Sequence, residues 1–156
     1  MHSYITHVLT LSDWQEVRSL QNKLIAFEQS IRLQRKCSTG DGPFNYLKEN
    51  IIQNNGVCLL AWNNDIAVGF ISGWITKGDG LDQGDNRIGY ICDCFVLPEH
   101  RNQKVFKSLL SEMINYFHVR DIKNISTDTL GSNQDMQMVL EKSGFKIHRV
   151  IYEMPI

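Results

Sequence analysis

The stretch Tyr90–Leu110, YICDCFVLPEHRNQKVFKSLL, decides the fold of this chain. Its apolar first half, as far as Leu97, predicts a buried strand, and Pro98–Gln103 predicts a turn. From Val105 onward, apolar residues recur at three- and four-residue steps, which predicts a helix. A strand that turns directly into a helix gathers unpaired backbone N–H groups at the positive end of the helix dipole. The stretch therefore predicts an anion site suited to phosphate.

Apolar periodicity and turn residues predict further elements on both sides of this stretch. Alternating or continuous apolar runs predict strands, and helical spacing of apolar residues predicts helices. The strands are expected at Tyr4–Leu9, Val57–Trp62, Ile66–Ile75, Ile125–Thr129 and Phe145–Met154, and the helices at residues 14–27, 43–52 and 132–143. The predicted order along the chain is β-α-α-β-β-β-α-β-α-β, which is a mixed α/β fold.

Length and composition narrow the class of protein. The chain has 156 residues, which suits one domain over residues 1–156, and its 17 acidic residues nearly balance 16 basic ones. This balance argues against nucleic-acid or membrane partners, and no apolar run is long enough to cross a bilayer. The N-terminus lacks a signal-peptide pattern, so a cytoplasmic protein is expected. The cysteines (Cys37, Cys58, Cys92 and Cys94) are expected to be reduced thiols, and no metal site is expected, because no second cysteine pair lies at ligand spacing.

Two motifs carry a resemblance to a known family. The central strand, followed by V-x-P-E-x-R and a turn into a helix ending in -LL, resembles the acetyl-CoA-binding core of the GNAT superfamily of N-acetyltransferases. The later segment NQDMQMVLEKSGF is similar to the family pattern N-x-x-A-x-x-x-Y-x-K-x-G-F, with matches at Asn133, Lys142, Gly144 and Phe145. The element order is also that of the family, so the resemblance covers nearly the whole chain. It implies a mostly antiparallel central sheet flanked by helices, with acetyl-CoA as cosubstrate.

The chain departs from the family pattern at three positions. The usual turn is R/Q-x-x-G-x-G/A; Arg101 fits it, but Lys104 and Phe106 occupy the glycine positions, and Leu140 occupies the usual tyrosine position. Lys104 could meet a phosphate with its charge, and Phe106 could either fill the cofactor channel or rotate into the core. These departures leave a second hypothesis open, a catalytically silent family member that acts as a binding or regulatory module.

The resemblance assigns cofactor binding to three places. In the family, strands four and five splay apart, strand-four backbone groups bind pantetheine, and N–H groups of the following turn hold pyrophosphate. The matching residues here are Cys94, Phe95, Val96 and Leu97 in the strand, Arg101, Asn102, Gln103, Lys104, Val105, Phe106 and Lys107 in the turn, and Asn133. Asn133 fits a helix cap equally well.

Acetylation of an amine requires that the amine be neutral when it attacks, so a base is needed. Asp93 is the first candidate, since it is the only carboxylate in the apolar run of the central strand; burial would raise its pKa, or it could pair with a cationic amine. A hydrogen-bonded structural aspartate is the alternative. Cys92 occupies a position where related enzymes often have glutamate, and is the second catalytic candidate. The proton for the leaving thiolate could come from Tyr152, Tyr90 or water.

Acidic residues indicate the substrate class. Glu28 ends the first helix, the loop before the central strand carries aspartates at 79, 82 and 85, and Trp74 could line a pocket. With Asp93, these residues favour a cationic amine. The sequence thus predicts an acetyl-CoA-dependent N-acetyltransferase that acts by direct attack of a primary amine of a small molecule or peptide. A homodimer is a further possibility, because dimers are common in the family.

Overall fold

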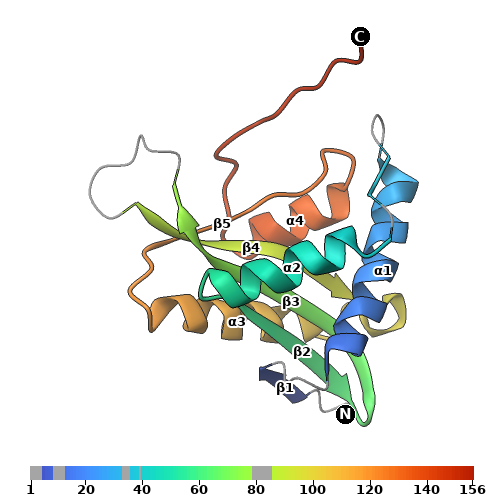
Figure 1. Cartoon of the computed structure of the whole chain (residues 1–156), viewed down its shortest axis with the longest axis vertical. Coiled ribbons are helices and arrows are strands. Elements are labelled where there is room, and N and C mark those ends of the chain that lie inside the picture. The colour runs from blue at the N-terminus through green and yellow to red at the C-terminus, as the bar shows by residue number, and fades with distance from the viewer. Residues whose placement is uncertain (1–4, 9–12, 33–35, 39, 79–85) are drawn as a thin grey trace.

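A five-stranded sheet forms the centre of the computed structural model, which describes residues 5–8, 13–32, 36–38, 40–78 and 86–156 (Figure 1). The strands lie in chain order: β1 (Ile5–Val8), β2 (Val57–Asn63), β3 (Ile66–Lys77), β4 (Arg87–Val96) and β5 (Asn124–Thr127). Neighbours from β1 to β4 pair antiparallel, and β5 pairs with β4 in parallel. The expected mixed, mostly antiparallel sheet is confirmed.

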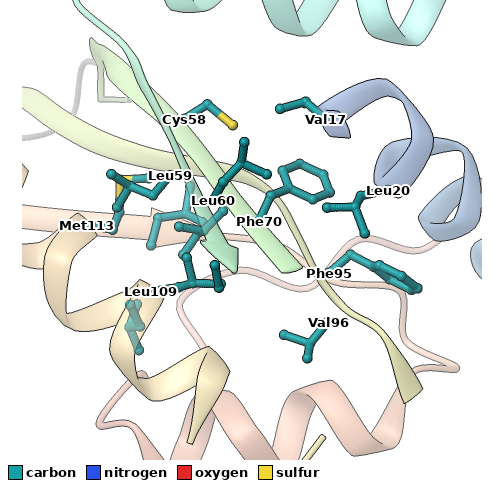
Figure 2. Close-up of a cluster of buried hydrophobic side chains, with 14 of the residues drawn as sticks. Val17, Leu20, Cys58, Leu59, Leu60, Phe70, Phe95, Val96, Leu109 and Met113 are labelled. Atoms are coloured by element: carbon teal, nitrogen blue, oxygen red, sulfur yellow. The ribbon is translucent and has the colours of Figure 1, made fainter. Parts of the chain in front are cut away.

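Helices cover both faces of this sheet. They are α1 (Trp14–Ile31), α2 (Gly42–Gln53), α3 (Val105–His118) and α4 (Gln134–Lys142), with a short 3-10 helix, η2 (Pro98–His100), between β4 and α3. Figure 2 shows α1 and α3 on opposite sides of the strands. Among the described residues, no helix combines the length and apolar character needed to span a membrane.

The continuous apolar run of β2 follows from this sandwich of helix, sheet and helix. Successive strand residues point to opposite faces, so a strand covered on both sides needs apolar residues at every position. Cys58 points toward Val17 of α1, whereas Leu59 points toward Met113 of α3 (Figure 2). All four of these side chains are buried, as is Phe70 of β3.

Two glycines let α3 approach the sheet closely. A Cβ at Gly89 of β4 would lie 2.6 Å from the Phe117 ring, and one at Gly73 of β3 would lie 3.3 Å from the same ring. Real Cβ atoms do not approach other heavy atoms to 2.6 Å, so Phe117 packs directly on the backbone of β4. Gly73 therefore also lies at a close packing contact with α3.

The predicted strand at Phe145–Met154 is wrong. α4 ends with Gly144 at φ +95°, and the N–H of Phe145 donates to the carbonyl of Leu140, a helix ending that needs no following strand. Beyond it the chain extends away from the body in no strand (Figure 1). Alternating apolar residues give this segment strand propensity, but a strand also needs a neighbour to pair with.

Smaller differences concern the ends and faces of elements. α1 runs past the predicted end at Phe27 to Ile31. Ile52, the last residue of the helix predicted at 43–52, is 68% exposed because it lies on the outer face of the last turn. The aspartates at 79, 82 and 85, which were expected to favour a cationic substrate, lie outside the described residues.

We expect Gly89→Ala to lower the free energy of unfolding by about 1–3 kcal/mol, because overpacking a filled core forces side chains and backbone to shift. Urea unfolding measures the change. Gly131→Ala is the matched control, since no atom lies within 4 Å of a Cβ built at Gly131. Equal stability of the two variants would contradict the close contact with Phe117, and Phe117→Leu should restore part of the loss caused by Gly89→Ala.

Candidate active site

β4 separates from β5 partway along its length. The pairing of β4 with β5 begins at Ile88 and ends where Ile91 lies beside Thr127. β4 itself continues to Val96 and stays paired with β3, where Val96 lies beside Gly69. The second half of β4 therefore has a strand neighbour on one side only among the described residues. This is the splayed arrangement that the family resemblance implied.

A bulge lies at the point of separation. Ile91 pairs with Gly73 and Cys94 pairs with Ile71, so β4 has one more residue than β3 between these two pairs. The extra residue belongs to Cys92-Asp93. A bulge turns side chains away from the regular alternation of a strand, and bulges are over-represented beside active sites.

Neighbouring side chains hold Asp93 on this bulge. The Nε2 of Gln21 in α1 donates to Oδ2 at 2.9 Å, and the Cys92 thiol donates to Oδ1 at 3.7 Å. The backbone N–H of Asp93 donates to the Ser72 hydroxyl at 3.3 Å. Gln21 is 3% exposed, and its Oε1 is buried without a hydrogen-bond partner. The carboxylate is thus held by α1 and β4, and the backbone of Asp93 is held by β3.

Burial raises the pKa of Asp93, while the hydrogen bonds from Gln21 and Cys92 lower it and Asp128 raises it. Burial is also the main cause that raises the pKa of Glu28 in α1, with further contributions from Asp93 and Asp128 and an opposing one from Arg32. Glu28, Asp93 and Asp128 are named below the acidic cluster. Their mutual repulsion would be relieved by a cation bound between them.

Tyr90 connects β4 with the end of β5 beside this cluster. Its hydroxyl donates to Oδ2 of Asp128 at 2.7 Å. Burial and this hydrogen bond raise the pKa of Tyr90, so the phenol stays protonated. Tyr152, the other tyrosine considered as a proton donor, is 92% exposed.

The turn predicted to bind phosphate has backbone angles that glycine adopts easily, although it contains no glycine. Asn102 has φ +60° and Lys104 has φ +69°, both in the left-handed region. The first helical hydrogen bond runs from Ser108 N–H to Lys104 O, so the N–H groups of Val105, Phe106 and Lys107 precede the helical ladder. Phe106 packs against the core, which is the second of its two predicted alternatives.

Arg101 lies against the protein itself. Its Nε donates to the carbonyl of Val96 at 3.0 Å, and its guanidinium lies 5.7 Å from the ring centroids of both Phe27 and Phe95. Arg101 therefore connects the end of β4 with α1. Asn133 caps α4, because its Oδ1 accepts from the N–H of Met136 at 3.2 Å.

The remaining predicted site residues lie in the core or in the turn. Trp74 is 4% exposed and packs edge-on against the rings of Tyr46 and Tyr90. The side chains of Phe95, Val96 and Leu97 are buried, so only their backbone could meet a ligand, and the N–H of Leu97 already donates to Val68 O. Cys94 is half-buried, and Gln103 is exposed in the turn, where it donates to Glu99 O.

Sequence reasoning missed Gln21 and Asp128. Gln21 had a visible signal, because it is a polar residue on the apolar helix face that Val17, Leu20 and Leu24 define. Asp128 directly follows β5, and only the parallel pairing of β5 with β4 brings it to Tyr90.

Comparison with known proteins agrees with this architecture. Residues 24–145 match the acetyltransferase (GNAT) family, so the chain belongs to that family. No curated protein sequence matches it.

Solved structures share the fold at low identity. Aminoglycoside N-acetyltransferase AAC(6')-Iy in complex with CoA superposes with a TM-score of 0.78 at 20% identity, over 99% of this chain and 96% of that one. Aminoglycoside 6'-N-acetyltransferase AAC(6')-Ih from Acinetobacter baumannii gives 0.76 at 17% identity, over 99% of both chains. A predicted acetyltransferase from Clostridium acetobutylicum with acetyl-CoA gives 0.77 at 16% identity, over 98% of this chain and 96% of that one.

We expect Asp93→Asn to flatten the pH dependence of stability. A carboxyl whose pKa is higher in the folded than in the unfolded state stabilises the fold at low pH, and this contribution is lost as the pH rises through the folded-state pKa. Wild type should therefore lose stability relative to Asp93→Asn as the pH rises from the ordinary aspartate value of 3.8 toward neutrality. Urea unfolding across this range measures the difference.

Asp65→Asn, in the exposed turn between β2 and β3, is the control for this experiment. Its side chain is exposed, so this variant should unfold at about the same urea concentration as wild type. A constant difference between wild type and Asp93→Asn would mean that the folded state does not raise the pKa of Asp93.

Proposed function

We propose that this protein is an acetyl-CoA-dependent N-acetyltransferase that acetylates a primary amine of a small, cationic molecule. The observation that carries the proposal is the position of Asp93, a buried carboxyl with a raised pKa on the β4 bulge where β4 leaves β5. Membership of the acetyltransferase (GNAT) family supplies the reaction class.

The residues present suit coenzyme A. The N–H groups at the start of α3 point out of the helix at the positive end of its dipole, which suits pyrophosphate. Lys104 and Lys107 are exposed beside them and add positive charge. The second half of β4, which has no strand from the described residues beside it on the β5 side, would accept pantetheine amides through its backbone. Acetyl-CoA, when bound, supplies an activated acetyl thioester.

The acidic cluster suits an amine that arrives as an ammonium ion. Glu28, Asp93 and Asp128 come from α1, β4 and the end of β5, and Glu28 interacts electrostatically with both of the others. A cation among them would relieve their repulsion and offset the cost of burying negative charge. The similarity to aminoglycoside acetyltransferases, although only of fold, is compatible with a polyamine-like or aminoglycoside-like acceptor.

Asp93 has the protonation behaviour of a base for this reaction. A carboxyl with a raised pKa can take one proton from the bound ammonium, which leaves a neutral amine able to attack. Tyr90 stays a hydrogen-bond donor to Asp128 and is a poor acid, since its pKa is raised. The proton for the departing thiolate then comes more readily from the attacking nitrogen or from water than from Tyr90.

Cys92 supports direct attack of the amine. Burial, the charge of Asp93 and its hydrogen bond to Asp93 raise the pKa of the Cys92 thiol, which keeps it protonated. A protonated thiol is a poor nucleophile, so a covalent acetyl-cysteine step is disfavoured. In this proposal Cys92 is a donor that helps to hold Asp93 and does not itself react.

We expect acetyl-CoA to stabilise the protein against heat. At about 100 times the dissociation constant, a ligand adds about 2.7 kcal/mol to the free energy of unfolding, which raises the midpoint by several degrees. Lys104→Gly should keep the left-handed turn but weaken binding by about two- to five-fold, the size expected for one exposed charge pair. Thermal unfolding and titration calorimetry measure both effects.

Lys104→Arg is the matched control for charge and should bind acetyl-CoA like wild type. Tight binding by Lys104→Gly would assign the anion site to backbone groups alone. No thermal shift at millimolar acetyl-CoA would contradict the proposed enzyme and favour the silent binding module.

We expect Asp93→Asn to lower kcat by about 10²- to 10⁴-fold, the usual contribution of a general base. Glu28→Gln should mainly raise KM for a polyamine or aminoglycoside acceptor, by about two- to five-fold, since it removes attraction without removing the base. Release of the coenzyme A thiol during turnover measures both. Asp65→Asn is the control, and full activity of a folded Asp93→Asn variant would remove Asp93 from the catalytic site.

A further inference from the structure

Gln21 is a buried polar residue on the apolar face of α1, and its amide makes two hydrogen bonds through one nitrogen. Its Nε2 donates to Oδ2 of Asp93 at 2.9 Å and to the carbonyl of Pro43, in the first turn of α2, at 3.4 Å. Its Oε1 is buried and receives no hydrogen bond from the described residues. Burying a polar atom without a partner is costly, so other contacts must require the amide to lie this way.

The Pro43 carbonyl determines which way this amide faces. A side-chain amide has donors on its nitrogen and an acceptor on its oxygen. If the amide turned over, Oε1 would face the Pro43 carbonyl and the Asp93 carboxylate, which both accept hydrogen bonds. Gln21 therefore offers Asp93 an N–H donor. A donor of this kind stabilises an ionised carboxylate more than a protonated carboxyl.

The start of α2 is itself held on α1 by two contacts that precede Gln21 in the helix. The Trp14 ring packs edge-on against the Phe44 ring, with 5.8 Å between the ring centroids. Arg18, one turn before Gln21, forms an ion pair with Asp41, which caps α2. These contacts fix the position of the α2 carbonyl that meets the Gln21 amide.

The two carboxyl oxygens of Asp93 differ in how they are held. Oδ2 accepts from the Gln21 amide at 2.9 Å. Among the described residues, Oδ1 accepts only from the Cys92 thiol at 3.7 Å, and a thiol is a weak donor. Oδ1 therefore keeps the greater capacity to accept a proton from a bound ligand.

We propose that Gln21 is a positioning residue for Asp93: it holds Oδ2 with an N–H that the start of α2 orients, so that Oδ1 takes the proton from the amine. This inference rests on the acetyltransferase function proposed above. In the step itself, the ammonium gives one proton to Oδ1, which leaves a neutral amine and a protonated Asp93, while the Gln21 N–H stays on Oδ2. Without this donor, Asp93 would stay protonated to a higher pH and less of the protein would hold an ionised base.

Other titratable groups also face Asp93 from the elements packed around it. Asp128, after β5, raises the pKa of Asp93, and Asp93 in turn raises the pKa of Glu28 in α1. Burial raises the pKa of three nearby thiols, which stay protonated: Cys58 of β2, and Cys92 and Cys94 of β4. Because Gln21 is uncharged, replacing it leaves all these groups in place, and the change in titration reports the lost donor.

Gln21→Met removes the donor and keeps an unbranched side chain of similar size. The acidic limb of kcat/KM against pH reports the pKa of the base in the free enzyme. We expect this limb to move to higher pH by about one to two units, the effect of losing one hydrogen bond to a charged group. Gln21→Asn, whose amide is one methylene shorter, should move the limb in the same direction. Gln15→Met, at an exposed position of α1, is the matched control and should keep the wild-type limb.

Asp41→Asn distinguishes the Gln21 amide from the general packing of α2 on α1. This variant removes the ion pair with Arg18 but leaves the amide in place, and Trp14 still packs on Phe44. Its acidic limb should stay close to that of wild type. A shift as large as that of Gln21→Met would overturn the proposal, because loosening the two helices would then be enough to explain it.

The pH dependence of stability tests the same hydrogen bond without catalysis. The folded state raises the pKa of Asp93, so its stabilising contribution is present at low pH and is lost as the pH rises through that pKa. In Gln21→Met the pKa should be higher still, so the urea midpoint should go on falling to a pH about one to two units higher than in wild type. In an Asp93→Asn background, Gln21→Met should leave the pH dependence unchanged.

The two measurements separate failure of this inference from failure of the proposed function. The same pH dependence of stability in wild type and Gln21→Met would overturn the inference, whether or not the protein is an enzyme. An active enzyme with the same acidic limb in both proteins would overturn it too. If wild type transfers no acetyl group, the proposed function fails, and a shift in the stability titration still supports the control of Asp93 protonation by Gln21.

Discussion

The unequal pairing of β4 with its two neighbours is the constraint on which the site depends. At one end, Phe117 packs on the backbone of Gly89, which lies beside Ile125 of β5, so α3 covers the half of β4 that is paired on both sides. At the other end β4 stays with β3 and has no β5 residue beside it. The bulge at Cys92-Asp93 lies where β4 changes from two strand neighbours to one. The turn into α3 comes directly after the half of β4 that is paired with β3 alone.

The protonation state that Asp93 favours depends on two free energies, the cost of burying its charge and the gain from its hydrogen bonds. Burying an ionised carboxylate costs several kcal/mol even after relaxation, whereas a hydrogen bond to a charged group contributes about 1.5–3 kcal/mol net. The Cys92 thiol is a weak donor at 3.7 Å, so Gln21 and Cys92 offset only part of the desolvation, and the nearby charge of Asp128 opposes ionisation further. An ammonium ion would supply the missing positive charge, so the site is arranged to hold a proton or a cation.

The fold could be predicted from the sequence wherever the residues of a single segment are enough to specify its secondary structure. The strand–turn–helix, the strands β2 and β3, and the helix predicted at 132–143 all have local signals, and all are confirmed. The site needed tertiary information, because Gln21 meets Asp93 across 72 residues of sequence. The strand predicted from Phe145 onward is wrong for a related reason. An alternating apolar pattern indicates strand propensity but does not provide a neighbouring strand to pair with.

Lys104 and Phe106 replace the two glycines of the family pattern. These replacements change the side chains of the turn more than the backbone N–H groups that would bind an anion. Lys104 adopts the left-handed conformation that glycine adopts easily, and a side chain held there costs about 1–2 kcal/mol. Strain of this kind persists where the surrounding structure requires a particular backbone path. Phe106 packs against the core, so its ring contributes to folding. Because the donors at the start of α3 are backbone N–H groups, the turn keeps them with lysine and phenylalanine in place, and Lys104 adds a positive charge that glycine lacks.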